Sequence, residues 1–296
     1  VESVNPTVGE TVYDGAVGSG GFLIQAYDHM SKANLSTQEQ EFLKRDTFFG
    51  NEKTPLGYVM GVMNMILHGI DSPNVYKQNT LTENIRDIQE KERHNVILAN
   101  PPFGGKEKSQ VQQNFPVQSG ATEILFMQHF MKMLKLDGKA AIVVPEGVLF
   151  QGNNAFKQVK QELLENFNVH TILSLPAGVF LPYSGVKTNI IYFDRKGATS
   201  DIWFYELVPP YKLTKNKPIQ YEHFKEFLEL YESRKETDNS WLVKVNDIKD
   251  YDISAKNPTA EQEEELLPPK EIVQAIRAND KELGELVNHI EGLLNE

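Results

Sequence analysis

The residues best suited to chemistry are Asn100-Pro101-Pro102-Phe103, which directly follow the apolar run 96–99. Asn100 offers an amide oxygen and Pro101 a backbone carbonyl, which together can accept both hydrogens of a substrate amine. An amine held in this way keeps its lone pair free to attack an electrophile. Phe103 supplies a flat face on which a planar base can stack. The four residues also suit an ordinary Asn-Pro turn, and the motif by itself does not decide between the two interpretations.

The elements around this motif place it at an edge of a sheet. The run 96–99 has the length and branching of a buried strand, and the two prolines end it in an extended turn. Asn100 is therefore predicted to stand at the carboxyl end of a strand. In an open α/β sheet, that edge is where ligands bind.

A second motif upstream favours the chemical interpretation. Asp14 ends a strand predicted over residues 11–14, a turn containing Gly18 and Gly20 follows, and an apolar helix comes next. This order is typical of a nucleotide-binding turn between a strand and a helix. Leu23 stands where the third glycine of the dinucleotide pattern would fall, which disfavours NAD. Alone, the turn also fits a plain strand-to-helix connection.

Polar side chains also follow the second and third predicted strands. Glu52 ends the strand predicted over 46–52, where an acid is placed to accept hydrogen bonds from ribose hydroxyls. A surface carboxylate is the alternative. Asn79 follows a strand predicted over 74–76 and could meet an adenine edge, with Leu81 packing on its face.

The alternation of strands and helices up to Arg195 predicts a doubly wound α/β domain with a mostly parallel sheet of seven strands and helices on both faces. We expect a catalytic domain over 1–206, a mixed extension over 207–258 and a helical tail over 259–296. On a helix predicted over 55–68, the apolar spacing predicts a side that faces the core, formed by Met60, Met63 and Leu67.

The predicted tail carries an apolar stripe on an otherwise polar helix. Its spacing near three and four suits either packing on the protein's own core or docking against a partner's helix. The stripe consists of Ile272, Ile276, Leu283, Leu286, Val287, Ile290 and Leu293.

Composition limits the possible functions further. The formal net charge is −11, whereas a chain that grips duplex DNA unaided usually carries a basic patch, so a partner is expected to supply much of any such grip. The absence of cysteine excludes disulfides and thiolate zinc sites and fits a cytoplasmic location. The histidines have no metal-ligand spacing, so no metal is expected. No apolar run is long enough to span a bilayer, so no membrane association is expected.

Taken together, the chain resembles S-adenosylmethionine-dependent amino-methyltransferases of the Asn-Pro-Pro-aromatic group. More narrowly, from near Val8 to the terminal helix, it resembles the methylation subunit of type I restriction–modification systems. Later segments that carry the narrower resemblance are residues 144–150, 187–190 (Lys-Thr-Asn-Ile) and 251–254 (Tyr-Asp-Ile-Ser).

The resemblance implies a Rossmann-like fold and methyl transfer from S-adenosylmethionine to N6 of an adenine flipped out of DNA, with no metal. It implies that Asn100 and the Pro101 carbonyl orient the target amine, that Pro102 completes the rigid turn, and that Phe103 stacks on the base. The implied partners are DNA, a specificity subunit and a translocating restriction subunit. The implied cofactor residues are Asp14, Ala16, Gly18, Ser19, Gly20 and Gly21 at the methionine end, Glu52 at the ribose, and Asn79 and Leu81 near the adenine.

The chain departs from the family pattern at three positions. Gly15 stands where such proteins often have proline, Val17 where cysteine is common, and Asn79 where aspartate is frequent. The first two are expected to alter loop rigidity and packing, and the third to weaken binding of the cofactor's adenine. Such subunits also carry a Phe-x-Thr-Pro-like segment and a helical domain ahead of the glycine-rich turn. We expect both to be missing here and the chain to be inactive alone.

Three other functions fit the same motifs. Asn-Pro-Pro-aromatic sites also methylate protein glutamines and RNA bases. A third possibility is a non-catalytic assembly module that uses this fold as a scaffold for a specificity partner.

Overall fold

The computed structural model describes residues 1–259, 277, 279, 283 and 284. Residues Val1–Pro258 form one compact unit. The predicted helical tail, with its apolar stripe, lies almost entirely outside the described residues.

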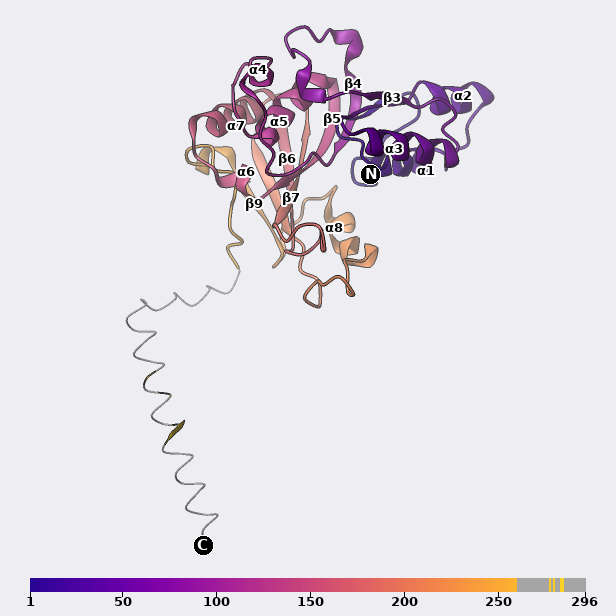
Figure 1. The fold of residues 1–296 in the computed structure, drawn as a ribbon. Helices are drawn as coiled ribbons and strands as arrows, with labels where there is room; N and C mark the ends of the chain where they lie inside the picture. The colour runs from indigo at the N-terminus through magenta and orange to yellow at the C-terminus, as the bar shows by residue number, and fades with distance from the viewer. Residues whose placement is uncertain (260–276, 278, 280–282, 285–296) are drawn as a thin grey trace. The chain divides into compact units, whose positions relative to one another are not determined.

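A mixed sheet of nine strands forms the centre of this unit, in the order β3-β2-β1-β4-β5-β7-β6-β8-β9 (Figure 1). Strands β7 and β9 run antiparallel to their neighbours, and the other neighbours are parallel. The strands are β1 (Val12–Asp14), β2 (Phe48–Glu52), β3 (Asn74–Lys77), β4 (His94–Ala99), β5 (Leu134–Pro145), β6 (Asn168–Leu175), β7 (Thr188–Asp194), β8 (Asp201–Glu206) and β9 (Ser240–Lys244).

The order of the strands brings the two sequence motifs together. Strands β1 and β4 are parallel neighbours, with Val12 paired to Val96 and Tyr13 to Ile97. Asp14 and Asn100 therefore lie at the same edge of the sheet, at adjacent carboxyl ends. From β1 the chain continues to β2 and β3 on one side, and it then crosses to β4 on the other side of β1. This reversal makes the edge a topological switch point.

The prediction of seven strands was wrong, because β8 and β9 extend the sheet beyond β6. Ile172 on β6 pairs with Phe204 on β8, which in turn pairs with Trp241 on β9. The two aromatic rings stack with centroids 5.6 Å apart and are buried, so burial of aromatic surface explains why the sheet continues. The predicted boundary at residue 206 therefore falls inside the compact unit.

Helices cover both faces of the sheet, as predicted (Figure 1). Buried residues of α1, α2, α3 and α8 form one core with β1, β2 and β3, and those of α5, α6 and α7 form a second core on the other face. The helices are α1 (Gly21–Met30), α2 (Thr37–Arg45), α3 (Pro55–Leu67), α4 (Ser109–Gln112), α5 (Thr122–Met133), α6 (Gly147–Phe150), α7 (Asn154–Asn166) and α8 (Lys225–Leu230), with 3-10 turns η1 (Thr80–Thr82), η2 (Glu90–Glu92), η3 (Tyr221–Phe224) and η4 (Val245–Asp247).

The side of α3 that we expected to face the core faces outward instead. Met60, Met63 and Leu67 are 52%, 55% and 78% exposed, and the helix contacts the protein through Gly61 and Met65. Because α3 is apolar on nearly all sides, its spacing does not distinguish the buried side from the exposed one. Within the described residues, no helix has both the length and the apolar character needed to cross a membrane.

Candidate active site

The glycine-rich turn after β1 folds around a buried carboxylate. Asp14 is buried, and its Oδ1 accepts a hydrogen bond of 2.8 Å from the Ala16 amide. Gly18 and Gly20 have φ angles of 54° and 80°, a region that favours glycine, and Gly20 caps the start of α1. Thr80 ties the turn to η1, because its hydroxyl donates to the Gly15 carbonyl at 2.5 Å.

The surroundings of Asp14 disfavour its charged form. Burial raises the pKa of its carboxyl, the hydrogen bond from Ala16 lowers it, and the nearby charge of Glu52 raises it again, for a pKa of about 7. A cationic ligand group that approached Asp14 would favour its ionised form. The carboxyl is therefore poised to titrate near neutral pH.

Glu52, at the end of β2, joins the turn to the start of α3. Its Oε2 accepts from the Gly18 amide at 2.9 Å, while its Oε1 accepts from the amide and the hydroxyl of Thr54 at 2.8 and 2.7 Å. Burial alone would raise the pKa of Glu52, but these hydrogen bonds together outweigh it and hold the pKa below its usual value. Glu52 is therefore an ionised acceptor at the edge of the sheet.

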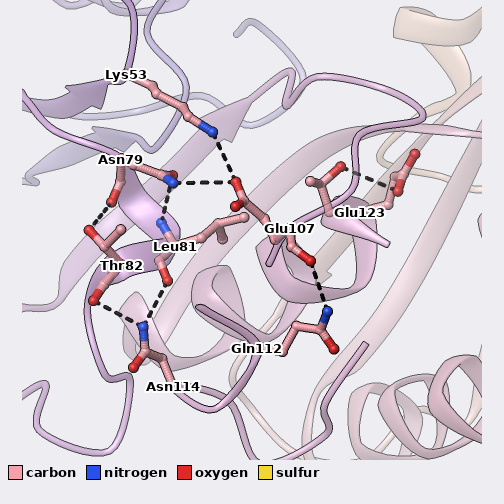
Figure 2. A network of polar contacts seen from close by, with 9 residues as sticks. Lys53, Asn79, Leu81, Thr82, Glu107, Gln112, Asn114 and Glu123 are labelled. Carbon is pink, nitrogen blue, oxygen red and sulfur yellow. Dashed lines mark hydrogen bonds and ion pairs between the residues drawn. The ribbon is translucent and has the colours of Figure 1, made fainter. Parts of the chain in front are cut away.

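Asn79 links the end of β3 to a loop that follows β4 (Figure 2). Its Oδ1 accepts from the Leu81 amide at 3.2 Å and so caps η1. Its Nδ2 donates to Oε1 of Glu107 at 3.3 Å, and Lys53 donates to the same oxygen at 3.0 Å. Leu81 itself is buried in the core.

At the end of β4, Asn100 holds a polar atom with no partner. Its Oδ1 is buried, and nothing in the described part of the chain donates a hydrogen bond to it. The turn is held just beyond, where the Gly104 amide donates to Oε1 of Glu123 at 2.5 Å. The ring of Phe103 meets Phe180 edge to face, with centroids 5.9 Å apart. An unpaired buried acceptor is costly, and substrate N–H groups could satisfy it.

Two adjoining cavities lie at this edge and share Gly105 and Lys106. The first, of about 490 Å³, is lined by Gly15, Ala16, Glu52, Lys53, Thr54, Asn79, Thr80, Asn100, Pro102, Gly105, Lys106, Glu107, Thr122 and Phe126. The second, of about 750 Å³, is lined by Phe103, Gly104, Gly105, Lys106, Gly120, Ala121, Glu123, Pro145, Gly147, Val148, Gln151, Phe156, Tyr183, Ser184 and Val186.

The first cavity gathers Ala16, Glu52, Asn79, Asn100 and Pro102 from the predicted site, and Phe103 lines the second. The other predicted residues line neither cavity: Asp14, Gly18, Ser19, Gly20, Gly21, Leu81 and Pro101. Asp14, Gly20, Leu81 and Pro101 are buried behind the edge, whereas Ser19 and Gly21 are exposed.

Sequence reasoning missed several residues of the first cavity. Lys53 and Thr54 directly follow Glu52, so the carboxyl end of β2 signals them. Glu107 comes from the polar loop 104–120, and Thr122 and Phe126 come from α5, whose start faces the turn. The described residues contain no group of three or more histidine, aspartate or glutamate side chains that could hold a metal ion.

Two of the later segments quoted for the family meet beside Phe103. Pro145 at the end of β5 pairs with Thr188 at the start of β7, and the Glu146 amide donates to the Lys187 carbonyl at 2.9 Å. Pro145, Gly147 and Val148 line the second cavity. Residues 144–150 and 187–190 therefore belong to the same edge as the Asn-Pro-Pro-Phe turn.

The strand order, the glycine-rich turn after β1 and the Asn-Pro-Pro-Phe turn after β4 define a Rossmann-like fold of the S-adenosylmethionine-dependent methyltransferase class. A family model described as N-6 DNA methylase matches residues 1–266, and the chain belongs to this family.

Several known proteins similar to this chain come from type I restriction systems. The methylase subunit of the type I restriction enzyme EcoEI from Escherichia coli is 35% identical over 311 residues, covering 99% of this chain and 62% of that protein. A chain in a structure on the assembly and conformational transition of the type I R-M system is 44% identical, with a TM-score of 0.85, covering 100% of this chain and 64% of that one.

The M protein of the type I restriction enzyme EcoKI is 30% identical in its crystal structure, with a TM-score of 0.70. That match covers 78% of this chain and 51% of the EcoKI chain. This chain therefore spans less than two thirds of the length of each of these relatives.

Proposed function

We propose that this chain carries the catalytic site of a DNA adenine-N6 methyltransferase subunit of a type I restriction–modification complex. The observation that carries the proposal is the buried, unpartnered Oδ1 of Asn100 at the wall of the first cavity. The family and the relatives support the same assignment.

The residues of the first cavity fit S-adenosylmethionine. The cavity, of about 490 Å³, is large enough for a nucleoside and lies beside a glycine-rich turn that leaves room for close approach. Glu52 would accept from ribose hydroxyls, and Asn79 with Leu81 would flank the adenine. The methionine end would be held by Asp14, Ala16, Gly18, Ser19, Gly20 and Gly21. When bound, the cofactor supplies a methyl group activated by its sulfonium sulfur.

The chain's own residues prepare the acceptor. Oδ1 of Asn100 and the carbonyl of Pro101 accept the two hydrogens of an exocyclic amine, which leaves the nitrogen lone pair free. Pro102 keeps the turn rigid, and Phe103 offers its face to the base. The second cavity, of about 750 Å³, gives a flipped base room beside that ring.

The net charge of −11 supports a division of labour in DNA binding. We propose that a specificity subunit and a restriction subunit supply most contacts to the phosphate backbone, since an acidic chain gains little from phosphate contacts by itself. The predicted tail stripe would dock on such a partner, and the complex would act in the cytoplasm.

The test is methyl transfer to DNA by this chain combined with the specificity subunit of its system. Labelled S-adenosylmethionine should yield N6-methyladenine in digested DNA. Asn100→Ala should lower the rate by about a hundredfold or more, because it removes the group that positions the amine. Binding of the cofactor in calorimetry should remain.

Other products would point to other functions. Detection of methylated glutamine or methylated RNA would identify protein or RNA, rather than DNA, as the substrate. If the assembled complex methylated none of these, a scaffold role would be favoured. Methylation by Asn100→Ala at the wild-type rate would refute the assignment of Asn100.

A further inference from the structure

The carboxylate of Glu107 lies in the wall of the first cavity and is held there by a loop. This residue lies three residues after Gly104, in the loop 104–120, and its side chain is only 10% exposed. It lines the first cavity together with Asn79 and Asn100. Burying an ionised group to this degree is costly unless other groups compensate it.

The compensation covers only one of its two oxygens (Figure 2). Oε1 of Glu107 accepts from Lys53 at 3.0 Å and from Nδ2 of Asn79 at 3.3 Å. Within the part of the chain that the structure describes, Oε2 has no hydrogen-bond donor. A carboxylate can accept about four hydrogen bonds, so this oxygen retains its full capacity inside the cavity.

The loop holds Glu107 in place through its backbone. The Glu107 amide donates to the Gly120 carbonyl at 3.0 Å, and its carbonyl accepts from Nε2 of Gln112 at 2.8 Å. The Thr122 amide donates to the Gly105 carbonyl at 3.2 Å, next to the isolated bridge between Lys106 and Ala121. These contacts fix the position of the carboxylate without using Oε2.

We propose that Glu107 is a ligand-binding residue that recognises a 6-aminopurine. Its Oε2 accepts a hydrogen bond from the exocyclic amino group of the purine in the cofactor. This inference rests on the proposed function and adds to it the residue that reads the purine. Asn79 and Lys53 act as positioning residues that orient the carboxylate.

The chemistry of Asn79 explains why a second residue is needed. Its Oδ1 already accepts from the Leu81 amide, and its Nδ2 donates to Glu107. The amide therefore presents a donor toward the carboxylate, while an amino group needs an acceptor. Glu107 supplies that acceptor from another part of the chain.

The alternative is that Glu107 only latches the loop to Lys53. A latch would stabilise the cavity for any purine, whereas a recognition residue distinguishes an amino group from a carbonyl at position 6. The ratio of two affinities therefore separates the two roles, because a general loss of order lowers both affinities together.

The experiment is calorimetric titration of the full chain with S-adenosylhomocysteine and with S-inosylhomocysteine, which carries a carbonyl in place of the amino group. The wild type should bind the adenosyl compound at least about tenfold more tightly, as expected for a hydrogen bond to a charged group. In Glu107→Gln, the ratio should fall to about one or reverse, because the amide can donate to the carbonyl.

Lys53→Met is the matched control, since it removes the same ion pair but keeps the carboxylate. It should weaken both compounds while keeping the preference for the adenosyl compound. An unchanged ratio in Glu107→Gln would overturn the inference and leave the cofactor site standing. Failure of the wild-type chain to bind either compound would instead overturn the cofactor assignment, and this inference with it.

Discussion

At the scale of single residues, Asn51 and Asn100 are both asparagines near the site, but their side chains differ in hydrogen-bond partners. Asn51 donates to the Tyr13 hydroxyl at 3.0 Å and accepts from Gln78 at 2.9 Å, whereas Oδ1 of Asn100 is unpaired in the described structure. Asn51→Ala should lower the free energy of unfolding by about 1–3 kcal/mol, because it removes a hydrogen bond from the buried Tyr13 hydroxyl. Asn100→Ala should change it by less than about 0.5 kcal/mol. Urea unfolding of both variants measures this, and equal losses would contradict a substrate-directed Asn100.

Asp14 predicts a dependence of stability on pH. Its pKa of about 7 in the folded protein exceeds the ordinary value of about 4. Between these values, the folded state keeps a proton that the unfolded state loses. The stabilising contribution is therefore complete below about pH 4 and is lost as the pH rises to about 7. Relative to Asp14→Asn, the wild type should lose at most about 1.4 kcal/mol per pH unit in this window. Urea unfolding between pH 4 and 8 tests this, and a pH-independent difference would rule it out.

Asp14 should also make cofactor binding depend on pH. The ammonium group of S-adenosylmethionine favours the ionised carboxylate, so binding should strengthen as the pH rises through about 7 and should release a proton. Calorimetry in buffers of different ionisation enthalpy counts that proton. Asp14→Asn should bind weakly and without the pH dependence, and a proton release that survives in this variant would assign it to another group.

At the scale of elements, α3 and the glycine-rich turn meet backbone to backbone. A Cβ on Gly61 would lie 2.6 Å from the Gly18 carbonyl oxygen, whereas a Cβ on Gly21 in α1 would meet nothing within 4 Å. Gly61→Ala should therefore cost about 1–3 kcal/mol of unfolding free energy and weaken cofactor binding. Gly21→Ala should stabilise the fold by about 0.5–1 kcal/mol, since alanine is the better helix former. Thermal unfolding of the pair gives both signs, and a neutral Gly61→Ala would contradict the close approach.

The same elements show what the sequence can predict. The helix predicted over 55–68 and the strand predicted over 74–76 match α3 and β3 closely, since Pro55 and the short apolar run mark them. Helix α2 was missed, although Ser36 and Glu39 form a capping box at its start. Ligand groups at strand ends, such as Glu52 and Asn100, follow from topology. Glu107 does not, because loop 104–120 reaches the cavity only through contacts with distant segments.

At the scale of the whole molecule, patterning did not place β8 and β9 in the sheet, which has nine strands rather than the seven predicted. Residues 240–244 follow a long segment that contains η3 and α8, and only their pairing with β8 makes them part of the sheet. Trp203, Phe204 and Trp241 are all buried. Burial of these aromatic side chains favours the addition of β8 and β9 to the sheet. Periodicity identifies a strand, but its neighbours depend on long-range packing.

The outer side of α3 exposes six large apolar side chains, more than any other helix among the described residues. Its exposed members are Leu56, Val59, Met60, Met63, Ile66 and Leu67. A contiguous apolar surface of this kind promotes association. Replacing Met60 and Met63 together by lysine should lower both the binding of an apolar fluorescent dye and self-association in sedimentation.

The free energy of unfolding should stay within about 0.5 kcal/mol in that double variant, because both side chains are more than half exposed. Met65→Lys is the control on the same helix. Met65 is fully buried, so a charge there should unfold the protein or cost several kcal/mol. Comparable destabilisation by the double variant would mean that the outer side of α3 is packed in solution, and dye binding that stays unchanged would place the exposed apolar surface elsewhere.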